Sequence, residues 1–316
     1  MAEESQEILG EKTTTPIRTA TVLDCIGKTP LFELRRMGDA PIFGKGEFLN
    51  PGGSVKDRVA RYLLTEAERR GQLRPGMRIA EATSGNTGIG VALVGRMLGY
   101  PVTIVMPEDM SEERKKIILA LGAELVLTPA ADSIKGACDR VKAMAAEDSN
   151  IYIPGQFDNP LNPEIHYLET AQELFEQLDG QVDAFVAGVG SGGTLGGVGR
   201  FLKEQNPSGY VVAVEPANSA ALLGHEPGLH QIQGIGDGFV PAVLDTSPIH
   251  EVITVTDKQA VETTREIARR EGLLCGTSSG ANVWAALRVA EKMPAGARIA
   301  TVLPDRAERY FSTALI

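Results

Sequence analysis

Four short segments of the 316-residue chain combine glycine with hydroxyl and amide side chains, the residue types that bind anions and polar ligands. They span 50–58, 83–88, 188–194 and 276–280. Each segment follows an apolar or strand-like run and precedes a helix-like run. We therefore expect each one to bring the free N–H groups of a helix N-terminus to a ligand-binding edge of a sheet.

The segment 188–194 is the strongest candidate for a phosphate site. Its glycines let the backbone approach a phosphate closely, and Ser191 and Thr194 add hydroxyl donors. We expect the phosphate contacts to come from its second half, namely Gly190, Ser191, Gly192, Gly193 and Thr194.

The same segment also fits a dinucleotide-binding pattern. Gly188, Gly190 and Gly193 have the spacing G-x-G-x-x-G, and Glu215 ends the next strand-like run, where a ribose-binding acid is expected. An NAD-dependent oxidoreductase is therefore an alternative hypothesis. A single motif of this kind is weak, however, and it leaves Lys56 and the other three segments unexplained.

Lys56 is the candidate nucleophile. It does not fit the lysine of a P-loop, because Val55 precedes it and Asp57 follows it. The helix dipole disfavours a cation at a helix start, and desolvation lowers the pKa of a lysine and makes it more nucleophilic. Those properties are the ones that Schiff-base chemistry requires.

The remaining sequence predicts the elements that position these segments. Strand-like runs lie at 78–82, 102–106, 124–127, 184–187, 211–214 and 299–303. Helix-like runs lie at 87–98, 111–121, 163–178, 195–204 and 258–271, with Gly122 and Gly272 at expected C-terminal caps. This alternation predicts βαβ units, parallel sheet and an α/β fold.

Composition excludes several classes of protein. The formal net charge is −10 and no dense Lys/Arg cluster occurs, so we expect no nucleic-acid partner. Cys25, Cys138 and Cys275 are too far apart for a zinc site or a disulfide framework, so we expect no metal. Neither a secretory signal nor a membrane span is present, so a cytoplasmic protein with a flexible leader at residues 1–20 is expected.

Taken together and in order, these motifs resemble the cysteine synthase (O-acetylserine sulfhydrylase) family of the fold-type II pyridoxal-phosphate enzymes. The resemblance runs from about Thr21 to Ile316. It rests on the motifs Ile26–Leu31, Asn50–Arg58, Thr83–Gly88, Gln156–Pro160, Gly190–Thr194, Ile232–Gly236, Gly276–Gly280 and Glu308–Tyr310.

The family resemblance implies two open twisted sheets, mostly parallel and flanked by helices, with the cofactor in a cleft between two domains. We expect residues 51–155 to form a smaller, mobile domain that carries the substrate loop. Residues 21–50 and 156–316 should form the larger domain, into which the N-terminal segment crosses.

The resemblance also implies roles for individual residues. Lys56 would hold pyridoxal 5′-phosphate as a Schiff base and then act as the base and acid of the reaction. Asn86 would bind the ring hydroxyl, Ser278 would face the pyridine nitrogen, and Gly190–Thr194 would bind the phosphate. The substrate would contact Thr83, Ser84, Asn86, Thr87, Gln156 and Gly234. The alternative interpretation of Asn86, Thr87 and Ser278 is that they only cap helices.

The implied reaction is a β-replacement that forms L-cysteine from O-acetyl-L-serine and sulfide through an aminoacrylate intermediate. The alternatives within the family are O-phosphoserine with sulfide, or serine with homocysteine as in cystathionine β-synthase. A phosphoserine enzyme would place a cation near the leaving group. The segment 220–233 contains His225 and His230 but no Arg or Lys, which favours acetylserine.

Two further expectations follow from the resemblance. The family implies a homodimer, and its members can bind the C-terminal tail of serine acetyltransferase in the active site, so a regulatory role as its partner is possible. The chain departs from the family pattern after Pro304, where Asp305, Arg306 and Ala307 replace the usual small residues. This departure bears on substrate preference or on the electronics of the cofactor ring.

Overall fold

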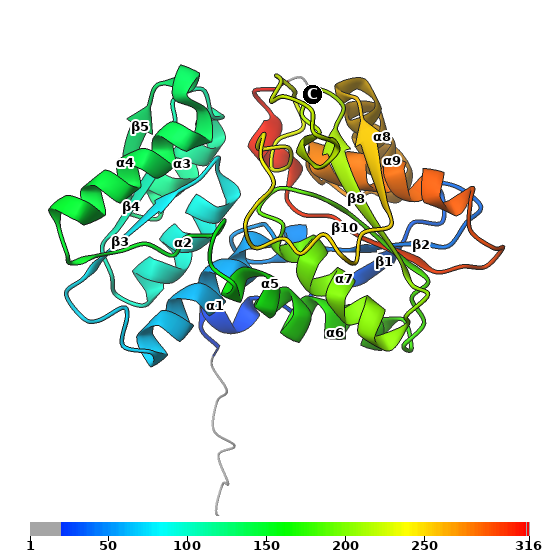
Figure 1. Ribbon diagram of the computed structural model, residues 1–316, viewed down its shortest axis with the longest axis horizontal. Helices are drawn as coiled ribbons and strands as arrows, with labels where there is room; N and C mark the ends of the chain where they lie inside the picture. The colour runs from blue at the N-terminus through cyan, green and yellow to red at the C-terminus, as the bar shows by residue number, and fades with distance from the viewer. Residues whose placement is uncertain (1–19, 314, 316) are drawn as a thin grey trace, which may run out of the picture.

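The chain alternates strands and helices and forms two separate sheets (Figure 1). This computed structural model describes residues 20–313 and 315. The leader expected at residues 1–20 therefore lies outside the described residues, except for Ala20. Within the described part of the chain, no helix is long and apolar enough to cross a membrane.

The larger sheet has six strands in the order β1-β2-β10-β7-β8-β9. Their bounds are β1 Leu31–Glu33, β2 Ile42–Lys45, β7 Ala184–Gly188, β8 Tyr210–Pro216, β9 Glu251–Val255 and β10 Ile299–Val302. Neighbouring strands are parallel except β1 and β2, which are antiparallel. Ile42 is paired with Ile299, so the N-terminal strands belong to the sheet that the C-terminal half builds.

The smaller sheet has four parallel strands in the order β5-β4-β3-β6. Their bounds are β3 Arg78–Ala82, β4 Val102–Pro107, β5 Glu124–Thr128 and β6 Ile151–Tyr152. Every residue of β4 is buried, as expected for a central parallel strand that is covered on both faces.

Helices cover both sheets. Their bounds are α1 Lys56–Arg69, α2 Asn86–Met97, α3 Glu112–Ala120, α4 Ser133–Glu147, α5 Leu161–Ile165, α6 Gln172–Gln177, α7 Gly193–Gln205, α8 Asp257–Glu271 and α9 Thr277–Ala290. Short 3₁₀ turns lie at η1 Val22–Cys25, η2 Glu47–Leu49, η3 Ala130–Asp132, η5 Ala221–Leu223 and η6 Ala307–Tyr310.

The strand β7 shows why the sequence forms this architecture. Ala184 and Val186 point into the core under α8 and α9, whereas Phe185 and Ala187 point into the core under α7. Because both faces of the sheet are covered, the strand is an unbroken apolar run without alternation of polar residues.

The predicted strands at 78–82, 102–106, 124–127, 184–187, 211–214 and 299–303 are confirmed, with end shifts of one or two residues. The predicted helix 163–178 is confirmed. The segment is helical, but the turn His166–Ala171 is a π-helix between α5 and α6. Gly272 ends α8 in the left-handed conformation, with φ 72°, as predicted.

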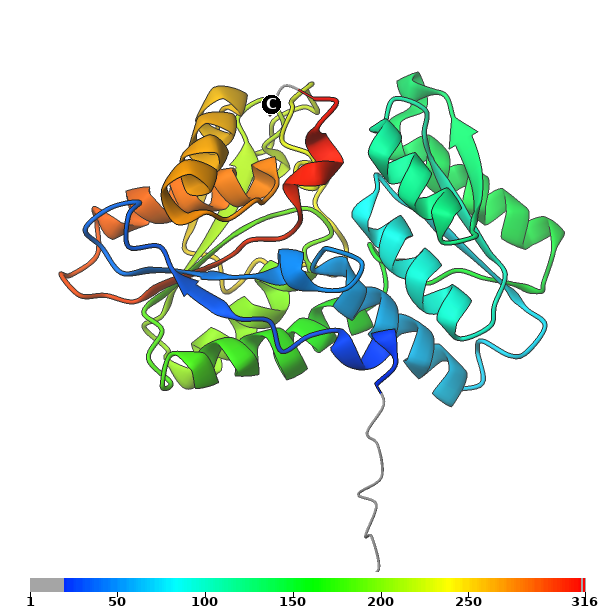
Figure 2. The same cartoon turned by 180° about the vertical axis from the view of Figure 1, so that it is seen from behind.

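The two sheets form two lobes that meet along a common base (Figures 1 and 2). On that base Val59 and Leu63 of α1 pack against Leu161 and Ile165 of α5. The proposed domain boundaries at residues 50/51 and 155/156 stay predictions. The arrangement leaves the carboxyl ends of both sheets facing the space between the lobes, where α/β proteins bind ligands.

Candidate active site

One cavity lies between the lobes, and the four glycine-rich segments converge on it. Of the residues predicted to bind cofactor or substrate, those that line it are Lys56, Thr83, Ser84, Asn86, Thr87, Gln156, Gly190, Ser191, Gly192, Thr194, Gly234 and Ser278. Gly193 is the exception among the predicted residues. It is packed against Asn162 instead of facing the cavity.

Lys56 is the first residue of α1 and lies partly buried in the cavity. Val55, at the N-cap, has no side chain that could cap the helix. Burial lowers the pKa of the Lys56 amine, and the charges of Asp237 and Asp305 oppose that shift. The amine is thus neutral over a wider pH range than that of an exposed lysine, which a nucleophilic amine requires.

The segment before α7 is shaped to let a ligand approach its backbone. Gly192, at the N-cap, has φ 80° and no side-chain cap, so the first N–H groups of α7 stay free. A Cβ on Gly190 would lie 2.3 Å from the carbonyl oxygen of Gly234. The glycines therefore meet a steric need, and the uncapped helix start suits a phosphate.

Two buried side chains hold this phosphate loop in place. Asn162 donates its amide to the Ser191 hydroxyl at 2.9 Å and to the Gln156 carbonyl at 2.8 Å. His166, in the π-turn, lies 3.3 Å from the Thr194 hydroxyl and 2.9 Å from that of Thr170. Burial lowers the pKa of His166 well below its usual value, so the ring is neutral.

The segment before α2 forms the facing wall. Gly85, at the N-cap, again offers no side-chain cap, and among the described residues the N–H groups of Asn86 and Thr87 have no partner, whereas the Gly88 N–H donates to the Thr83 hydroxyl at 3.4 Å. The Thr83 hydroxyl accepts the Gly85 N–H at 2.9 Å and thereby fixes the turn. The Thr87 hydroxyl donates to the Gln156 side chain at 2.6 Å, which joins the two predicted substrate segments.

Neither Asn86 nor Ser278 caps a helix. The N-caps are Gly85 and Gly276, and neither helix has a side-chain cap. Among the described residues the Ser278 hydroxyl has no hydrogen-bond partner, so it is available to a ligand in the cavity.

The comparisons with known proteins agree with this geometry. The model of the pyridoxal-phosphate dependent enzyme family matches residues 22–305. The chain belongs to this family. It is 47% identical over 298 residues to a protein named cysteine synthase from Staphylococcus aureus, covering 93% of this chain and 96% of that protein.

Solved structures of family members have the same fold. The O-acetylserine-dependent cystathionine β-synthase of Helicobacter pylori has a TM-score of 0.91 and 40% identity, covering 95% of this chain and 99% of that chain. Isoform 3 of the O-acetylserine sulfhydrylase of Entamoeba histolytica has a TM-score of 0.90 and 42% identity, covering 96% and 93%.

The residues of the cavity fit pyridoxal phosphate. The helices α1, α2, α7 and α9 all begin at it without a side-chain cap from their N-cap residues, and the Ser278 hydroxyl that lines it has no hydrogen-bond partner among the described residues. The free volume is about 50 Å³. A cavity of roughly 150 Å³ holds one benzene ring, so this free volume is smaller than a ring-sized ligand needs.

The dinucleotide hypothesis does not fit this family. Its key acid, Glu215, is buried and accepts the backbone N–H of Leu222 at 3.0 Å. Glu215 does not line the cavity. Its carboxylate holds the turn that follows β8, which leaves it unavailable to a ribose.

Three polar side chains that the sequence analysis did not assign also line the cavity: those of Arg114, Asp237 and Asn282. Asn282 accepts the Gly188 N–H at 2.8 Å and donates to the Val302 carbonyl at 2.9 Å, which fixes the ends of β7 and β10. Arg114 reaches the cavity from α3, a helix that carries no motif. Asp237 directly follows Gly236, the last residue of the motif Ile232–Gly236. An acidic residue next to this glycine-rich motif is the sequence signal that could have identified it.

The unusual residues after Pro304 bind other segments of the site. Asp305 accepts the Asn86 amide at 2.7 Å and the Tyr310 hydroxyl at 2.5 Å. The Arg306 side chain donates to the carbonyls of Phe48 at 2.8 Å and Asn50 at 3.3 Å. Asp305 therefore links to α2, and Arg306 holds the segment that leads to Lys56.

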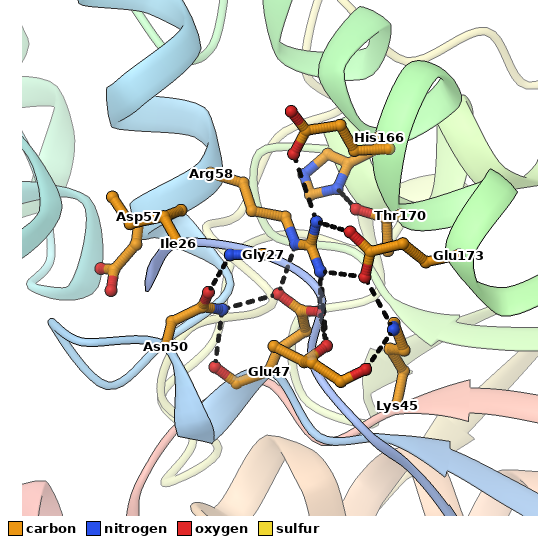
Figure 3. A network of polar contacts seen from close by, with 12 residues as sticks. Ile26, Gly27, Lys45, Glu47, Asn50, Asp57, Arg58, His166, Thr170 and Glu173 are labelled. Carbon is orange, nitrogen blue, oxygen red and sulfur yellow. Dashed lines mark hydrogen bonds and ion pairs between the residues drawn. The ribbon is translucent and has the colours of Figure 1, made fainter. Parts of the chain in front are cut away.

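A buried polar network fixes the start of α1 from the other side (Figure 3). Arg58 follows Lys56 by two residues in α1. Its side chain has 0% exposure and forms ion pairs with Glu47 at 2.8 Å and Glu173 at 2.7 Å. Burial alone would raise the pKa of the Glu47 carboxyl, but Arg58 holds it below its usual value. The network ties α1 to η2 and to the π-turn region.

Proposed function

We propose that this enzyme forms L-cysteine by replacing the β-acetoxy group of O-acetyl-L-serine with sulfide. The observation that carries the proposal is the position of Lys56. Its side chain, at the start of α1, lines the cavity where the segments 83–88, 188–194 and 276–280 meet. The cysteine synthase and O-acetylserine sulfhydrylase relatives support the same reaction.

We infer the roles of the residues as follows. The free N–H groups of α7, with Ser191 and Thr194, bind the cofactor phosphate, and Ser278 contacts the pyridine nitrogen. Asn86 contacts the ring hydroxyl. The free N–H groups of α2, with Thr83, Ser84, Thr87, Gln156 and Gly234, surround the amino-acid substrate.

Bound pyridoxal phosphate supplies an electron sink for the substrate Cα. Lys56 removes the proton from Cα, and burial, which lowers the pKa of its amine, favours the neutral form that this step requires. The Ser278 hydroxyl is a weaker partner for the pyridine nitrogen than a carboxylate. We infer that this weak contact favours prompt departure of the β-substituent.

Arg114 bears on whether the leaving group of the first substrate is acetate or phosphate. The segment 220–233 lacks Arg and Lys, but Arg114 brings a cation to the cavity from α3. Its guanidinium contacts Gln233 and the Tyr310 hydroxyl, and its Nε atom is buried without a partner. O-phospho-L-serine therefore belongs in the test beside O-acetyl-L-serine.

The test is the visible absorption spectrum of the purified, cofactor-loaded protein. We expect a band from cofactor linked to Lys56 that changes on addition of O-acetyl-L-serine and returns when sulfide is added. Lys56→Ala should lack the band and lose β-replacement by several orders of magnitude. The exposed Lys135→Ala, which loses only a surface pair with Asp139, is the matched control.

The outcomes separate the alternatives. A band that ignores O-acetyl-L-serine but responds to O-phospho-L-serine or L-serine keeps the chemistry and changes the substrate. A loaded protein without such a band, or a Lys56→Ala variant that keeps it, contradicts the assignment of Lys56.

We also propose that the enzyme is a cytoplasmic homodimer that can bind the C-terminal tail of serine acetyltransferase. These proposals rest on the family resemblance. Sedimentation equilibrium tests the dimer, and displacement of a tail peptide by O-acetyl-L-serine tests the shared site. A monomeric species across the working concentration range would contradict the first, and simultaneous binding of peptide and substrate the second.

A further inference from the structure

The amide side chain of Asn86 is held at both ends by residues from the chain after β10. Its Nδ2 atom donates to the Asp305 carboxylate at 2.7 Å, and its Oδ1 atom accepts a hydrogen bond from the Arg309 guanidinium. Asn86 is the first residue of α2 and lines the cavity that contains Lys56. Asp305 and Arg309 do not line that cavity, so they contact Asn86 from behind it.

These two partners fix the direction in which the amide of Asn86 faces. An ionised carboxylate only accepts hydrogen bonds, and a guanidinium only donates them. If the amide were turned by 180°, its oxygen would face the Asp305 carboxylate and its NH₂ group would face the Arg309 guanidinium, and both contacts would be repulsive. The pair therefore permits one orientation of the amide.

In this orientation the amide keeps one donor for a ligand. The NH₂ group of Asn86 carries two hydrogens, and Asp305 is the one partner that its Nδ2 atom has among the described residues. The second N–H is therefore available to an acceptor in the cavity. The cation at Oδ1 polarises the amide and makes this N–H a stronger donor.

Asp305 is itself fixed by two other segments of the site. The Gly276 N–H donates to its backbone carbonyl at 2.9 Å, and the Val55 N–H donates to the carbonyl of the preceding Pro304 at 2.9 Å. The Asp305 side chain is fully buried and accepts the Tyr310 hydroxyl at 2.5 Å. The carboxylate is thus an acceptor at a defined place, between the start of α9 and the segment before Lys56.

We propose that Asp305 and Arg309 are positioning residues for the cofactor, because they orient the Asn86 amide so that it donates to the ring oxygen of pyridoxal phosphate. This inference rests on the proposed function and deepens it. Without the two partners the amide could also present its own oxygen, which repels a deprotonated ring oxygen. The proposal gives a role to Asp305, where the chain departs from the family pattern.

The test compares two ligands that differ only in the ring hydroxyl. One is 4′-deoxypyridoxine 5′-phosphate, which has the hydroxyl but no aldehyde to react with Lys56, and the other is its 3-deoxy analogue. Calorimetry measures the affinity of each for the full-length protein freed of cofactor. The ratio of the two affinities reports the contribution of the ring oxygen, whereas general damage to the site lowers both affinities and leaves the ratio unchanged.

We expect wild type to favour the ligand with the hydroxyl. Asp305→Ala should reduce this preference about tenfold, as expected for the loss of a charge-assisted hydrogen bond. Asp305→Asn should keep the preference within about twofold, because its side-chain oxygen still accepts from Asn86. Arg309→Met removes the partner at the other end of the amide and should also reduce the preference, which provides the test if Asp305→Ala does not fold.

Two further variants show whether the effect passes through Asn86. In an Asn86→Ala background, Asp305→Ala should cause no further loss of preference. Arg306→Met is the matched control, because Arg306 belongs to the same segment but donates to the carbonyls of Phe48 and Asn50. It should change both affinities by the same factor. Equal preference in wild type and Asp305→Ala, or a further loss in the Asn86→Ala background, overturns the proposal.

A second readout uses the cofactor-loaded protein. A donor to the ring oxygen stabilises its deprotonated form, which absorbs in the visible region. Asp305→Ala should therefore shift absorbance from the visible band to the near ultraviolet at constant pH, and Arg306→Met should not. An unchanged spectrum of Asp305→Ala contradicts the proposal.

The measurements also distinguish this inference from the proposed function. If O-acetyl-L-serine produces no spectral change, the proposed reaction fails, but the ratio of the two affinities still tests the role of Asp305. If the spectral change occurs and the ratio is the same in wild type and Asp305→Ala, the reaction stands and the inference about Asp305 and Arg309 fails.

Discussion

The position of Lys56 shows how one residue acquires its chemistry. At a helix start the dipole opposes a positive charge, and burial in the cavity opposes it further, whereas Asp237 and Asp305 favour it. The balance lowers the pKa of the amine below the ordinary lysine value of 10.5. This lowered pKa is what the proposed role of Lys56 as a nucleophile requires.

A pH dependence follows from this shift. Only the neutral amine attacks the aldehyde of pyridoxal phosphate, so the rate of cofactor capture by cofactor-free protein should rise with pH and level off at the pKa of Lys56. We expect that midpoint below 10.5, measured by the growth of the visible band. Butylamine with free cofactor is the reference. A midpoint equal to that of butylamine contradicts a desolvated Lys56.

At the scale of elements, α1 depends on a buried charge network. Arg58 and Glu47 have side chains with 0% exposure, and Asn50 joins them through Glu47 at 2.8 Å (Figure 3). Asn50 also accepts the Gly27 N–H at 2.8 Å. The segment before Lys56 and the segment after it are therefore held by the same group of side chains.

Arg58→Met should lower the free energy of unfolding by about 3–5 kcal/mol, because it leaves the Glu47 carboxylate buried without its main partner. Urea unfolding measures the loss. The exposed pair of Arg200 with Glu204 provides the control, since Arg200→Met should cost at most about 1 kcal/mol. Adding Glu47→Gln to Arg58→Met should recover part of the loss. Equal losses for the two arginine variants would contradict a buried network.

At the scale of the whole molecule, the C-terminal segment connects the two lobes. Tyr310 and Asp305 come from the chain after β10, whereas Asn86 and Arg114 come from helices on the smaller sheet. The Tyr310 hydroxyl donates to Asp305 at 2.5 Å and accepts from Arg114 at 3.0 Å. Ser312 adds a further contact through hydrogen bonds to Glu113. These hydrogen bonds therefore connect the two lobes beside the cavity.

Tyr310→Phe should remove the hydrogen bonds of this hydroxyl and lower the free energy of unfolding by about 1–3 kcal/mol, because a buried carboxylate and guanidinium lose a partner. Urea unfolding checks the stability. The rate of cofactor entry should rise in the same variant, because fewer hydrogen bonds then connect the two lobes beside the cavity. Tyr62→Phe removes a partly exposed hydroxyl that donates to Glu164 and serves as the control. An unchanged free energy of unfolding and an unchanged rate of cofactor entry would contradict a role of Tyr310 in holding the lobes together.

Local pattern predicted the elements well where a strand is buried on both faces or a helix has a clear end. The run 102–106 and the cap Gly272 are examples. It predicted one continuous helix at 163–178, because the apolar period hardly changes there. The π-turn at His166–Ala171 coincides with tertiary contacts, in which the buried His166 reaches Thr194 of another helix.

The sequence by itself identified the glycine-rich segments, singled out Lys56 as the candidate nucleophile and predicted the chemistry that they share, because glycine, lysine and helix starts act through local geometry. Only the tertiary structure decided that β2 joins β10 and that Arg114 and Asp237 line the same cavity as Lys56. These facts depend on contacts between segments that are distant in the chain. No local pattern encodes such contacts, since they form only when both sheets pack around the same space.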